Sequence, residues 1–494
     1  MSRWQLNLVL HESSPSPIFV QIADAIVAEI QRGRLGKGAR LPGSRALAQS
    51  LKVHRNTVLS AYAELQSQGW LETRQASGTF VATDLPSAHL PNTTPSNGSA
   101  PHHSLGFELR SVHKPSLSFK PPPGILGMTA GMPDLRLIPV DELARAYRRA
   151  VKMRGHALMG YTEPQGHVAL RTALSAMLTK TRGLTPQPQN ILITRGSQMG
   201  LYLTARALLG PGDVVAVEAL GYPPAWDALR QTGARLVPIS VDERGFDTGE
   251  LEALLQREPV RAVYVTPHHQ YPTMAVMAPE RRAHLLALAR THRFAVIEDD
   301  YDNEFHYDGR PVLPLASADT HGVVLYLGTL SKALAPGLRL GYVVAPPEAI
   351  AALTALRTSI DRQGNQTIEA AVADLLEDGT VQRHARRMRR VYKTRRDALT
   401  DRLRARLGHV LSFEPPAGGM SLWATVHQDV DVDRWSAQGL KEKVFFSTGQ
   451  RFDFHQRRLQ TVRLGFACLT PEEIDTGTQR MLRALRACGH DGDL

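Results

Sequence analysis

The chain has 494 residues, of which 43% are hydrophobic and 21% are charged, as in a soluble globular protein with two or three domains. It contains no apolar run of membrane-spanning length, no N-terminal apolar segment of signal-peptide length and only two cysteines, which excludes a membrane protein and a disulfide framework, so a reducing, cytoplasmic compartment is expected. The net charge of +11 favours a polyanionic partner, since lysine and arginine release counterions from phosphate backbones.

The first compact unit is expected over residues 12–83 and begins with an amphipathic helix. The residues Phe19, Ile22, Ile26 and Ile30 fall on one helical face, and Gly33 is a plausible helix stop.

A shorter helix is predicted over residues 45–51, with Leu47 and Leu51 buried, and Lys52-Val53 then makes a tight turn. In the helix that follows, Val58, Tyr62 and Leu65 face inward, whereas the helix start exposes His54, Arg55, Asn56 and Thr57. A helix-turn-helix presents the first side chains of its second helix to the major groove in this way. The segment LETRQASGTFV predicts two short strands joined by a Ser-Gly turn, which would form a wing.

The run RLPGSRALAQSLKVHRNTVLSAYAELQSQGWLETRQASGTFV resembles the GntR-type winged helix without a gap. The resemblance implies that Arg45 and Thr57 anchor DNA phosphates, that Arg55 and Asn56 read bases or nearby phosphates, and that His54 belongs to the same surface. The alternative is a helical protein–protein module in which Arg40, Arg45 and Arg55 are ordinary solvated charges.

Residues 84–124 are rich in Pro, Ser, Asn and His, which predicts a flexible linker because such a segment cannot bury enough apolar surface to fold alone. In residues 125–490, apolar runs such as VVAVEA, AVYVTP, FAVIEDD and VVLYLGT alternate with helical patterns. These runs predict buried parallel strands in a layered α/β domain.

Residues suited to one cofactor follow three of the predicted strands. Since ligands collect at the carboxyl ends of such strands, the residues of interest are Asp299, Tyr301, Thr329, Ser331, Lys332 and Arg339. The segment NILITRGSQMGL passes through Gly196, Ser197 and Gln198 into a helix, whose first N–H groups form a phosphate cradle. Pyridoxal 5′-phosphate needs such a set: a lysine for the imine, an acid for the pyridine nitrogen and groups that hold the phosphate.

The motifs GMPDLRLIP, GYTEPQGHVALR, YVTPHHQYPT, IEDDYDNEF, GTLSKALAPGLRLGY and VRLGFA resemble the fold-type-I aminotransferase superfamily, and more narrowly the MocR/GabR-type regulators. The resemblance implies a mainly parallel sheet with flanking helices and a small C-terminal α/β subdomain. It also implies that Lys332 forms the imine, Asp299 pairs with the pyridine nitrogen, Tyr301 lies near the ring hydroxyl and Tyr222 stacks on the ring. The same resemblance implies that the phosphate is bound by Ser197, Gln198, Thr329, Ser331 and Arg339, and that Tyr161 reaches it from a neighbouring subunit. It also implies that Arg463 binds an effector carboxylate.

The chain departs from the aminotransferase pattern at two positions. Tyr271 stands where aminotransferases carry an asparagine that contacts the ring hydroxyl, and Met274 replaces a glycine. Alternative roles remain for three residues: core or dimer packing for Tyr222 and Tyr161, and an ordinary salt bridge for Arg463. The adjacent histidines at 268 and 269 have no carboxylate or cysteine at ligand spacing, so no metal site is predicted.

The segment VQRHARRMRRVYKTRR, residues 381–396, carries eight Lys/Arg and no acid. Its inner stripe is expected to contain Met388, Val391 and Tyr392, so the first interpretation is an exposed helix that leads into the small subdomain. The second is that its arginines extend the DNA-binding surface.

Together the two units predict a homodimeric transcription regulator, not an enzyme, that binds two half-sites on double-stranded DNA and senses pyridoxal phosphate, or an amine or amino acid, by aldimine exchange at Lys332. Two alternatives remain open. One is a working aminotransferase whose N-terminal unit is secondary, and the other is a cofactor-free regulator with a vestigial pocket.

Overall fold

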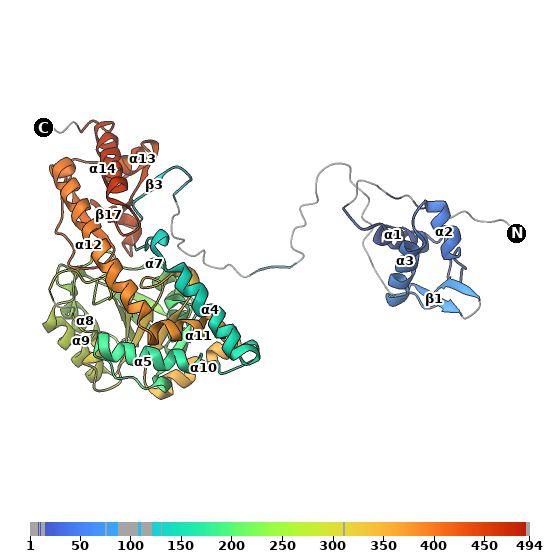
Figure 1. Cartoon of the computed structure of the whole chain (residues 1–494), viewed down its shortest axis with the longest axis horizontal. Helices are drawn as coiled ribbons and strands as arrows, with labels where there is room; N and C mark the ends of the chain where they lie inside the picture. The colour runs from blue at the N-terminus through green and yellow to red at the C-terminus, as the bar shows by residue number, and fades with distance from the viewer. Residues whose placement is uncertain are drawn as a thin grey trace. The chain divides into compact units, whose positions relative to one another are not determined.

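The computed structural model describes residues 8, 10, 15–74, 77–86, 107–109, 121–129, 131–309 and 312–490 (Figure 1). The chain divides into two compact units, Met1–Leu109 and Arg110–Leu494. Within the described residues, no helix combines the length and the apolar character that a membrane span requires.

The small unit has three helices around one apolar core: α1 (Ile18–Gln31), α2 (Ser44–Leu51) and α3 (Arg55–Ser67). The amphipathic pattern of α1 explains its packing, since Ile22, Ile26 and Ile30 are buried while Phe19 is half-buried. The predicted inward face of α3 is confirmed, because Val58, Tyr62 and Leu65 are all buried. Leu47 is buried as predicted, but Leu51, at the end of α2, is only half-buried.

Lys52 ends α2 in the left-handed conformation, with φ 56°, and this turns the chain into α3. After α3, β1 (Leu71–Arg74) pairs antiparallel with β2 (Gly78–Val81). Gly78 has φ 115°, a backbone conformation that side chains disfavour, so the predicted Ser-Gly corner lies where the hairpin requires a glycine. The small unit is therefore a winged helix-turn-helix.

The large unit is built on a seven-stranded sheet in the order β4-β12-β11-β10-β9-β5-β6. Its strands are β4 (Ile191–Thr194), β5 (Val214–Glu218), β6 (Arg235–Ile239), β9 (Ala262–Val265), β10 (Ala295–Asp300), β11 (Val324–Thr329) and β12 (Gly341–Val344). The four apolar runs named above are β5, β9, β10 and β11, which pair in parallel as predicted. Since β12 is antiparallel to both β11 and β4, β4 and β11 run in the same direction.

Helices cover both faces of this sheet, which explains the continuous apolar runs of its strands. On β5, Val215 and Val217 belong to the core with α6 (Ser197–Leu208), α7 (Pro223–Arg230) and α10 (Pro347–Ile360). The alternate residues Val214 and Ala216 pack toward α8 (Thr248–Leu255) and α9 (Pro279–His292). A further core joins the strands at the β4 edge to α4 (Val140–Arg154), α5 (Val168–Arg182) and α11 (Gln366–Glu377). Between β6 and α8, β7 (Val241–Asp242) and β8 (Gly245–Phe246) form a minor hairpin.

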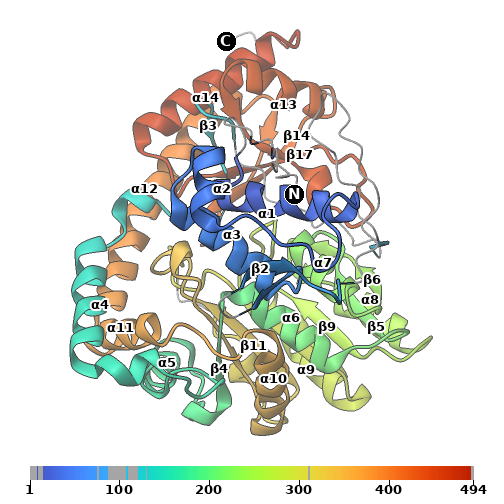
Figure 2. The same ribbon diagram turned by 90° about the vertical axis from the view of Figure 1, so that its right-hand side faces the viewer.

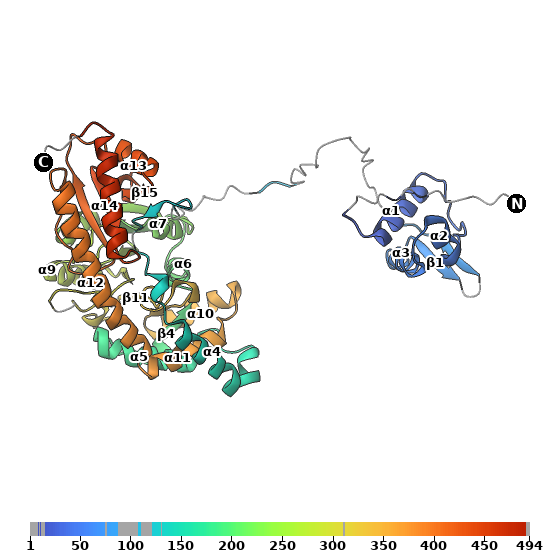
Figure 3. The same ribbon diagram turned by 45° about the horizontal axis from the view of Figure 1, so that its top comes forward.

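The long helix α12 (Thr380–Leu407) leads from the sheet region into a small subdomain (Figure 3). In that subdomain an antiparallel sheet has the order β13-β14-β17-β16 and packs with two further helices, α13 and α14. The bounds of these elements are β13 (Leu411–Ser412), β14 (Ser421–Val426), β16 (Ser447–Thr448), β17 (Thr461–Gly465), α13 (Val432–Lys441) and α14 (Pro471–Arg486). Figure 2 places this subdomain at one end of the large unit, above the seven-stranded sheet. The fold is that of a fold-type-I aminotransferase with its small C-terminal subdomain.

The beginning of the large unit is attached to the small subdomain. β3 (Leu126–Gly127) pairs in parallel with β15 (Val444–Phe445), and the Met128 carbonyl accepts a hydrogen bond from Gly465. Most of the predicted linker, residues 84–124, lies outside the described residues, although Leu85 still packs against the core of the small unit. The predicted domain boundaries therefore stay predictions.

Candidate functional site

The site centres on Lys332, three residues after the end of β11. Its Nζ donates a hydrogen bond to the carbonyl of Gly131 at 2.6 Å. Burial lowers the pKa of Lys332 to about 8, although the carboxylate of Asp302 acts in the opposite direction. The amine is therefore neutral in a substantial fraction of molecules near pH 8, and only a neutral amine is a nucleophile.

Asp299 lies near the carboxyl end of β10, on the strand next to β11. Its Oδ2 accepts a hydrogen bond from the hydroxyl of Tyr264 at 2.8 Å, while its buried Oδ1 has no partner. Burial raises the pKa of Asp299 to about 6. An unpartnered carboxylate oxygen in an apolar environment costs free energy, so this atom is suited to a cationic or N–H group of a ligand.

Three tyrosines lie together beside these charged groups. The Tyr301 hydroxyl donates to the carbonyl of His269 at 2.9 Å. Tyr222, at the start of α7, and Tyr271 make an edge-to-face contact with ring centroids 5.0 Å apart. Tyr271 thus fills the position of the missing asparagine with an aromatic ring, and it gives the site an aromatic wall.

A cradle of backbone N–H groups lies where β4 passes into α6. Gly196 precedes α6 with φ 79°, and no side chain caps the N–H groups at the start of this helix. A Cβ atom on Gly196 would collide with the guanidinium of Arg339, so only glycine allows this arginine to approach the helix start. Free N–H groups beside an arginine form an anion site.

The other residues predicted at the phosphate lie around this cradle. Thr329 Oγ accepts from the Ser331 N–H at 3.0 Å, which fixes the turn after β11. Ser197 is the first residue of α6. The side-chain amide of Gln198 donates to the Pro224 carbonyl at 2.9 Å, so this amide is already engaged within the protein.

Arg463, on β17, is 1% exposed and has a buried Nε without a hydrogen-bond partner. Its guanidinium lies 3.9 Å from the ring centroid of Tyr271. Within the described part of the chain no acidic side chain forms an ion pair with it, so the salt bridge considered as its alternative role is not found. A buried guanidinium without a carboxylate is suited to an anionic ligand.

Tyr161 differs from the other residues predicted to bind the cofactor because it lies at the surface. Its side chain is 81% exposed, and the guanidinium of Arg362 stacks on its ring at 4.3 Å. Within one chain, therefore, Tyr161 has no part in the buried site.

Sequence reasoning missed three groups of this site. Gly131 and Tyr264 hydrogen-bond Lys332 and Asp299, and Asp302 contributes a charge that acts on Lys332. Tyr264 left a signal, because a hydroxyl-bearing residue within the apolar strand β9 needs a polar partner on a neighbouring strand. Gly131 left none, since its contact joins residues 201 positions apart.

A third histidine, His306, lies near the adjacent pair His268 and His269. His306 lies on a later segment of the chain than the pair, and this segment forms an isolated β-bridge between His306 and Gly418. The spacing of near neighbours in the sequence gives no sign of this third histidine, because His306 is distant from the pair along the chain.

In the small unit, the start of α3 carries the residues predicted to contact DNA. His54 is the N-cap, and its Nδ1 accepts from the Asn56 N–H at 3.2 Å. Arg55 is exposed and donates through Nε to the Ser44 hydroxyl at 3.3 Å. Arg45 and Asn56 are also exposed, and Thr57 is half-buried. His54 therefore has a structural task besides its predicted place on the DNA-binding surface.

The basic segment, residues 381–396, lies within α12 and is amphipathic. Met388 and Tyr392 are buried and Val391 is half-buried, which agrees with the predicted inner stripe. Its last two arginines are buried, and Arg395 pairs with Asp134 at 2.9 Å. The exposed side chains are Arg383, Arg386, Arg387, Arg389 and Arg390, and their role in DNA binding stays a prediction.

The sequence matches the aminotransferase class I and II family over residues 123–481 and the gntR family of bacterial regulatory proteins over residues 19–81. The probable rhizopine catabolism regulatory protein MocR of Rhizobium meliloti is 32% identical over 490 residues, which cover 99% of this chain and 97% of that protein. The HTH-type transcriptional regulator TauR of Rhodobacter capsulatus is 32% identical and covers 94% of this chain and 96% of its own. The alpha-aminoadipate aminotransferase LysN of Thermus thermophilus, solved with N-(5′-phosphopyridoxyl)-L-leucine, aligns with a TM-score of 0.69 at 31% identity and covers 74% of this chain and 93% of its own.

Proposed function

Because this chain belongs to the MocR/GabR-type regulators, in which a gntR-family domain is joined to an aminotransferase class I and II domain, we propose that it regulates transcription in response to a ligand bound at Lys332. The ligand is pyridoxal 5′-phosphate, or an amine or amino acid that reaches the cofactor. The observation that carries the proposal is the group of buried charges around Lys332, in which Asp299 and Arg463 each keep an unpartnered polar atom.

The residues present fit pyridoxal phosphate. When bound, the cofactor supplies an aldehyde that bonds covalently to an amine and a pyridine ring that withdraws electrons. Lys332 would provide the amine, and Asp299 Oδ1 would accept the pyridine N–H. The helix start at Ser197, together with Arg339, would neutralise the phosphate.

Arg463 is the residue that we assign to an effector carboxylate. Its guanidinium lies over the ring of Tyr271, and a guanidinium can bind a planar carboxylate through two parallel N–H groups. A carboxylate there would pair with a charge that the described protein leaves unpaired. This favours amino acids over simple amines as effectors.

A regulatory rather than catalytic role is supported by Tyr271 and by the small unit. Tyr271 cannot supply the amide that aminotransferases direct at the ring hydroxyl. The small unit exposes Arg55 and Asn56 at the start of α3, where a helix-turn-helix contacts the major groove. Turnover of amino and keto acids at ordinary enzymatic rates would instead favour an aminotransferase.

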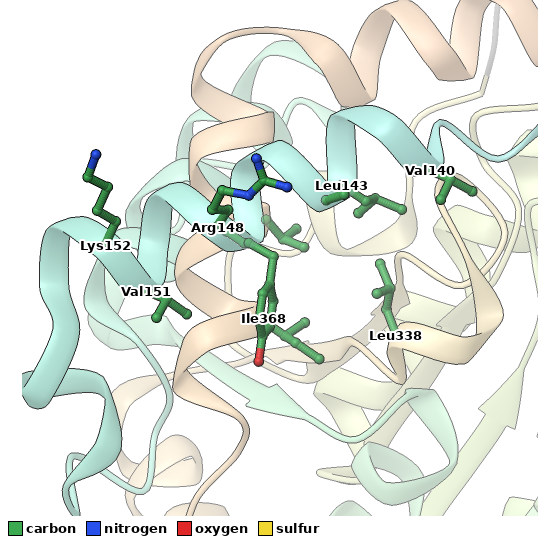
Figure 4. Close-up of a pocket in the computed structure, with 11 residues that line it drawn as sticks. Val140, Leu143, Arg148, Val151, Lys152, Leu338 and Ile368 are labelled. Atoms are coloured by element: carbon green, nitrogen blue, oxygen red, sulfur yellow. The ribbon is translucent and has the colours of Figure 1, made fainter.

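We propose that the regulator is a homodimer whose partner copy covers an apolar groove on the large unit. The groove has a volume of about 750 Å³ and lies between α4, α11 and Leu338, with Val140, Leu143, Val151 and Ile368 directed into it (Figure 4). Val140 is 64% exposed. An apolar patch of this kind is typical of a protein–protein interface. In such a dimer the exposed Tyr161 would be free to approach the phosphate of the other copy.

The test uses the untruncated protein with pyridoxal phosphate, borohydride reduction and peptide mass spectrometry. We expect one pyridoxyl group on Lys332, and none on that peptide in Lys332→Ala, while a Lys180→Ala control at an exposed lysine keeps the label. An unlabelled Lys332 at saturating cofactor would leave only the cofactor-free regulator.

Binding to the upstream DNA of its own gene is then followed by gel shift as cofactor and amines are added. Lys332→Ala should lose the response, and Arg463→Gln should keep the label but lose the response to amino acids. An Arg463→Gln protein that responds like the wild type would contradict the assignment of Arg463.

A further inference from the structure

Three histidines, none of which is assigned to the cofactor, form a cluster in the large unit. His268 and His269 follow β9, and His306 follows β10, the adjacent strand of the sheet. One ring nitrogen from each lies within 4.8 Å of the others. His268 and His269 are 3% and 1% exposed, and His306 is half-buried.

Most ring nitrogens of this cluster lack a hydrogen-bond partner. Both nitrogens of His268, Nε2 of His269 and Nδ1 of His306 are buried and unpartnered. A buried polar atom without a partner costs about 1–3 kcal/mol, so four such atoms in one place indicate a missing ligand.

His269 is already oriented as a metal ligand. Its Nδ1 lies 2.6 Å from Asp302 Oδ1, and this contact fixes the ring and leaves Nε2 free. A histidine that donates one N–H to a carboxylate and offers its second nitrogen is the usual arrangement at metal sites. A Cβ atom on Gly418 would occupy the position beside Nε2, so the glycine keeps this space open.

We propose that His268, His269 and His306 bind one transition-metal dication, for which Zn²⁺ is the best match. Neutral imidazoles suit zinc, and three of them with one open position form a tetrahedral site. With Zn–N bonds of about 2.1 Å, the ligand atoms would be about 3.4 Å apart, so ligand atoms that now lie up to 4.8 Å apart need to approach by up to about 1.4 Å.

The surroundings of His306 give the ion access and room for a fourth ligand. Of the three histidines only His306 lines a hollow of about 420 Å³, whose polar lining includes Asn303 and Glu304 but also the cationic side chains of Arg182, Arg386 and Arg389. Asn303 Nδ2 is itself buried without a partner. A water molecule bound to the metal could accept a hydrogen bond from this amide. The site needs no residue of the groups assigned to pyridoxal phosphate, so the two proposals can fail independently.

The test uses the full-length protein without a histidine tag, stripped with a chelator and titrated with Co²⁺. We expect one Co²⁺ per chain, with visible absorption bands of four-coordinate cobalt that disappear when Zn²⁺ is added. His268→Gln and His306→Gln should each weaken Co²⁺ binding at least tenfold. The matched control, His102→Ala with His103→Ala, removes another adjacent pair of histidines and should bind Co²⁺ like the wild type.

Circular dichroism and thermal unfolding check that the variants fold. If neither variant folds, X-ray absorption of the zinc-loaded wild type decides. Multiple scattering from three imidazoles would support the proposal, and a shell of oxygen ligands alone would overturn it. A wild type that binds no Co²⁺, or folded variants that bind it unchanged, would overturn it as well.

Discussion

Buried ionisable side chains near Lys332 hold protons at unusual pH values. Burial raises the pKa of Asp299 from 3.8 to about 6 and lowers that of Lys332 from 10.5 to about 8. Each shift means that the folded protein stabilises the neutral form relative to the unfolded chain. Without a ligand, the burial of Asp299 and Lys332 therefore lowers the free energy of unfolding. A ligand group whose charge is opposite to that of the buried side chain can restore part of this free energy.

We expect Asp299→Asn to stabilise the cofactor-free protein at neutral pH. Between about pH 3.8 and 6 the native state binds more protons at this position than the unfolded state, so wild-type stability falls as the pH rises, and the full cost is present above pH 6. The variant does not ionise and should gain at most about 3 kcal/mol at pH 7.5, but little at pH 4. Urea unfolding at both pH values measures this gain.

The exposed Asp401 provides the control, because Asp401→Asn should change stability little at either pH. An Asp299→Asn protein without a gain between pH 4 and 7.5 would contradict the burial argument.

We expect the same variant to hold pyridoxal phosphate more weakly, since Asn cannot balance the charge of a protonated ring.

The sequence predicts the ionisable residues of the site but not the residues that form hydrogen bonds with them. Lys332 and Asp299 could be predicted because each follows an apolar strand at the edge where ligands collect. Tyr264 left only the signal of a hydroxyl within an apolar strand, and Gly131 and His306 could not be placed, because their contacts depend on how distant segments pack.

Among the elements, the loop between β9 and α9 contains both departures from the aminotransferase pattern, Tyr271 and Met274. Met274 has φ 67°, in the left-handed region, and is 6% exposed. Its sulfur lies 3.6 Å from the Ser421 hydroxyl, on the small subdomain. The residue that replaces glycine therefore has an unfavourable backbone conformation, and its side chain connects the loop to the small subdomain.

We expect Met274→Gly to be more stable than Met274→Ala by about 1 kcal/mol, because both lose the side chain but only alanine retains the left-handed strain. Thermal unfolding of the two variants measures the difference. In the exposed helical control, Ala253→Gly should lose stability by up to about 1 kcal/mol. A Met274→Ala protein as stable as Met274→Gly would show that the strain is negligible.

The hydrophobic pattern of the sequence predicts which segments are helices or strands. It does not predict the order of the strands in the sheet. The strands β5, β9, β10 and β11 could be predicted because their faces are both covered, which leaves continuous apolar runs. The antiparallel insertion of β12 between β11 and β4 could not, since strand neighbours depend on long connections rather than on local pattern. The wing could be predicted because its turn requires a glycine.

For the whole molecule, we expect Val140→Asp to weaken the dimer at least about tenfold, or 1.4 kcal/mol, by placing a charge in the groove. Val140 is the first residue of α4, where an acid favours the helix, so the subunit itself should remain folded. Sedimentation equilibrium measures the dissociation constant.

Val168→Asp is the matched control, because Val168 is also exposed at the first position of a helix, α5, but does not line the groove. Equal effects of the two substitutions, or a wild type that is monomeric, would contradict the proposed dimer surface.

The path of the chain into the large unit links two otherwise separate parts of the protein. β3 is anchored on the small subdomain, and four residues later the carbonyl of Gly131 holds the amine of Lys332. Once the lysine nitrogen is engaged elsewhere, this carbonyl loses its donor. A change at the lysine nitrogen therefore alters the hydrogen bonding of a backbone segment that is covalently continuous with the connection to the winged helix.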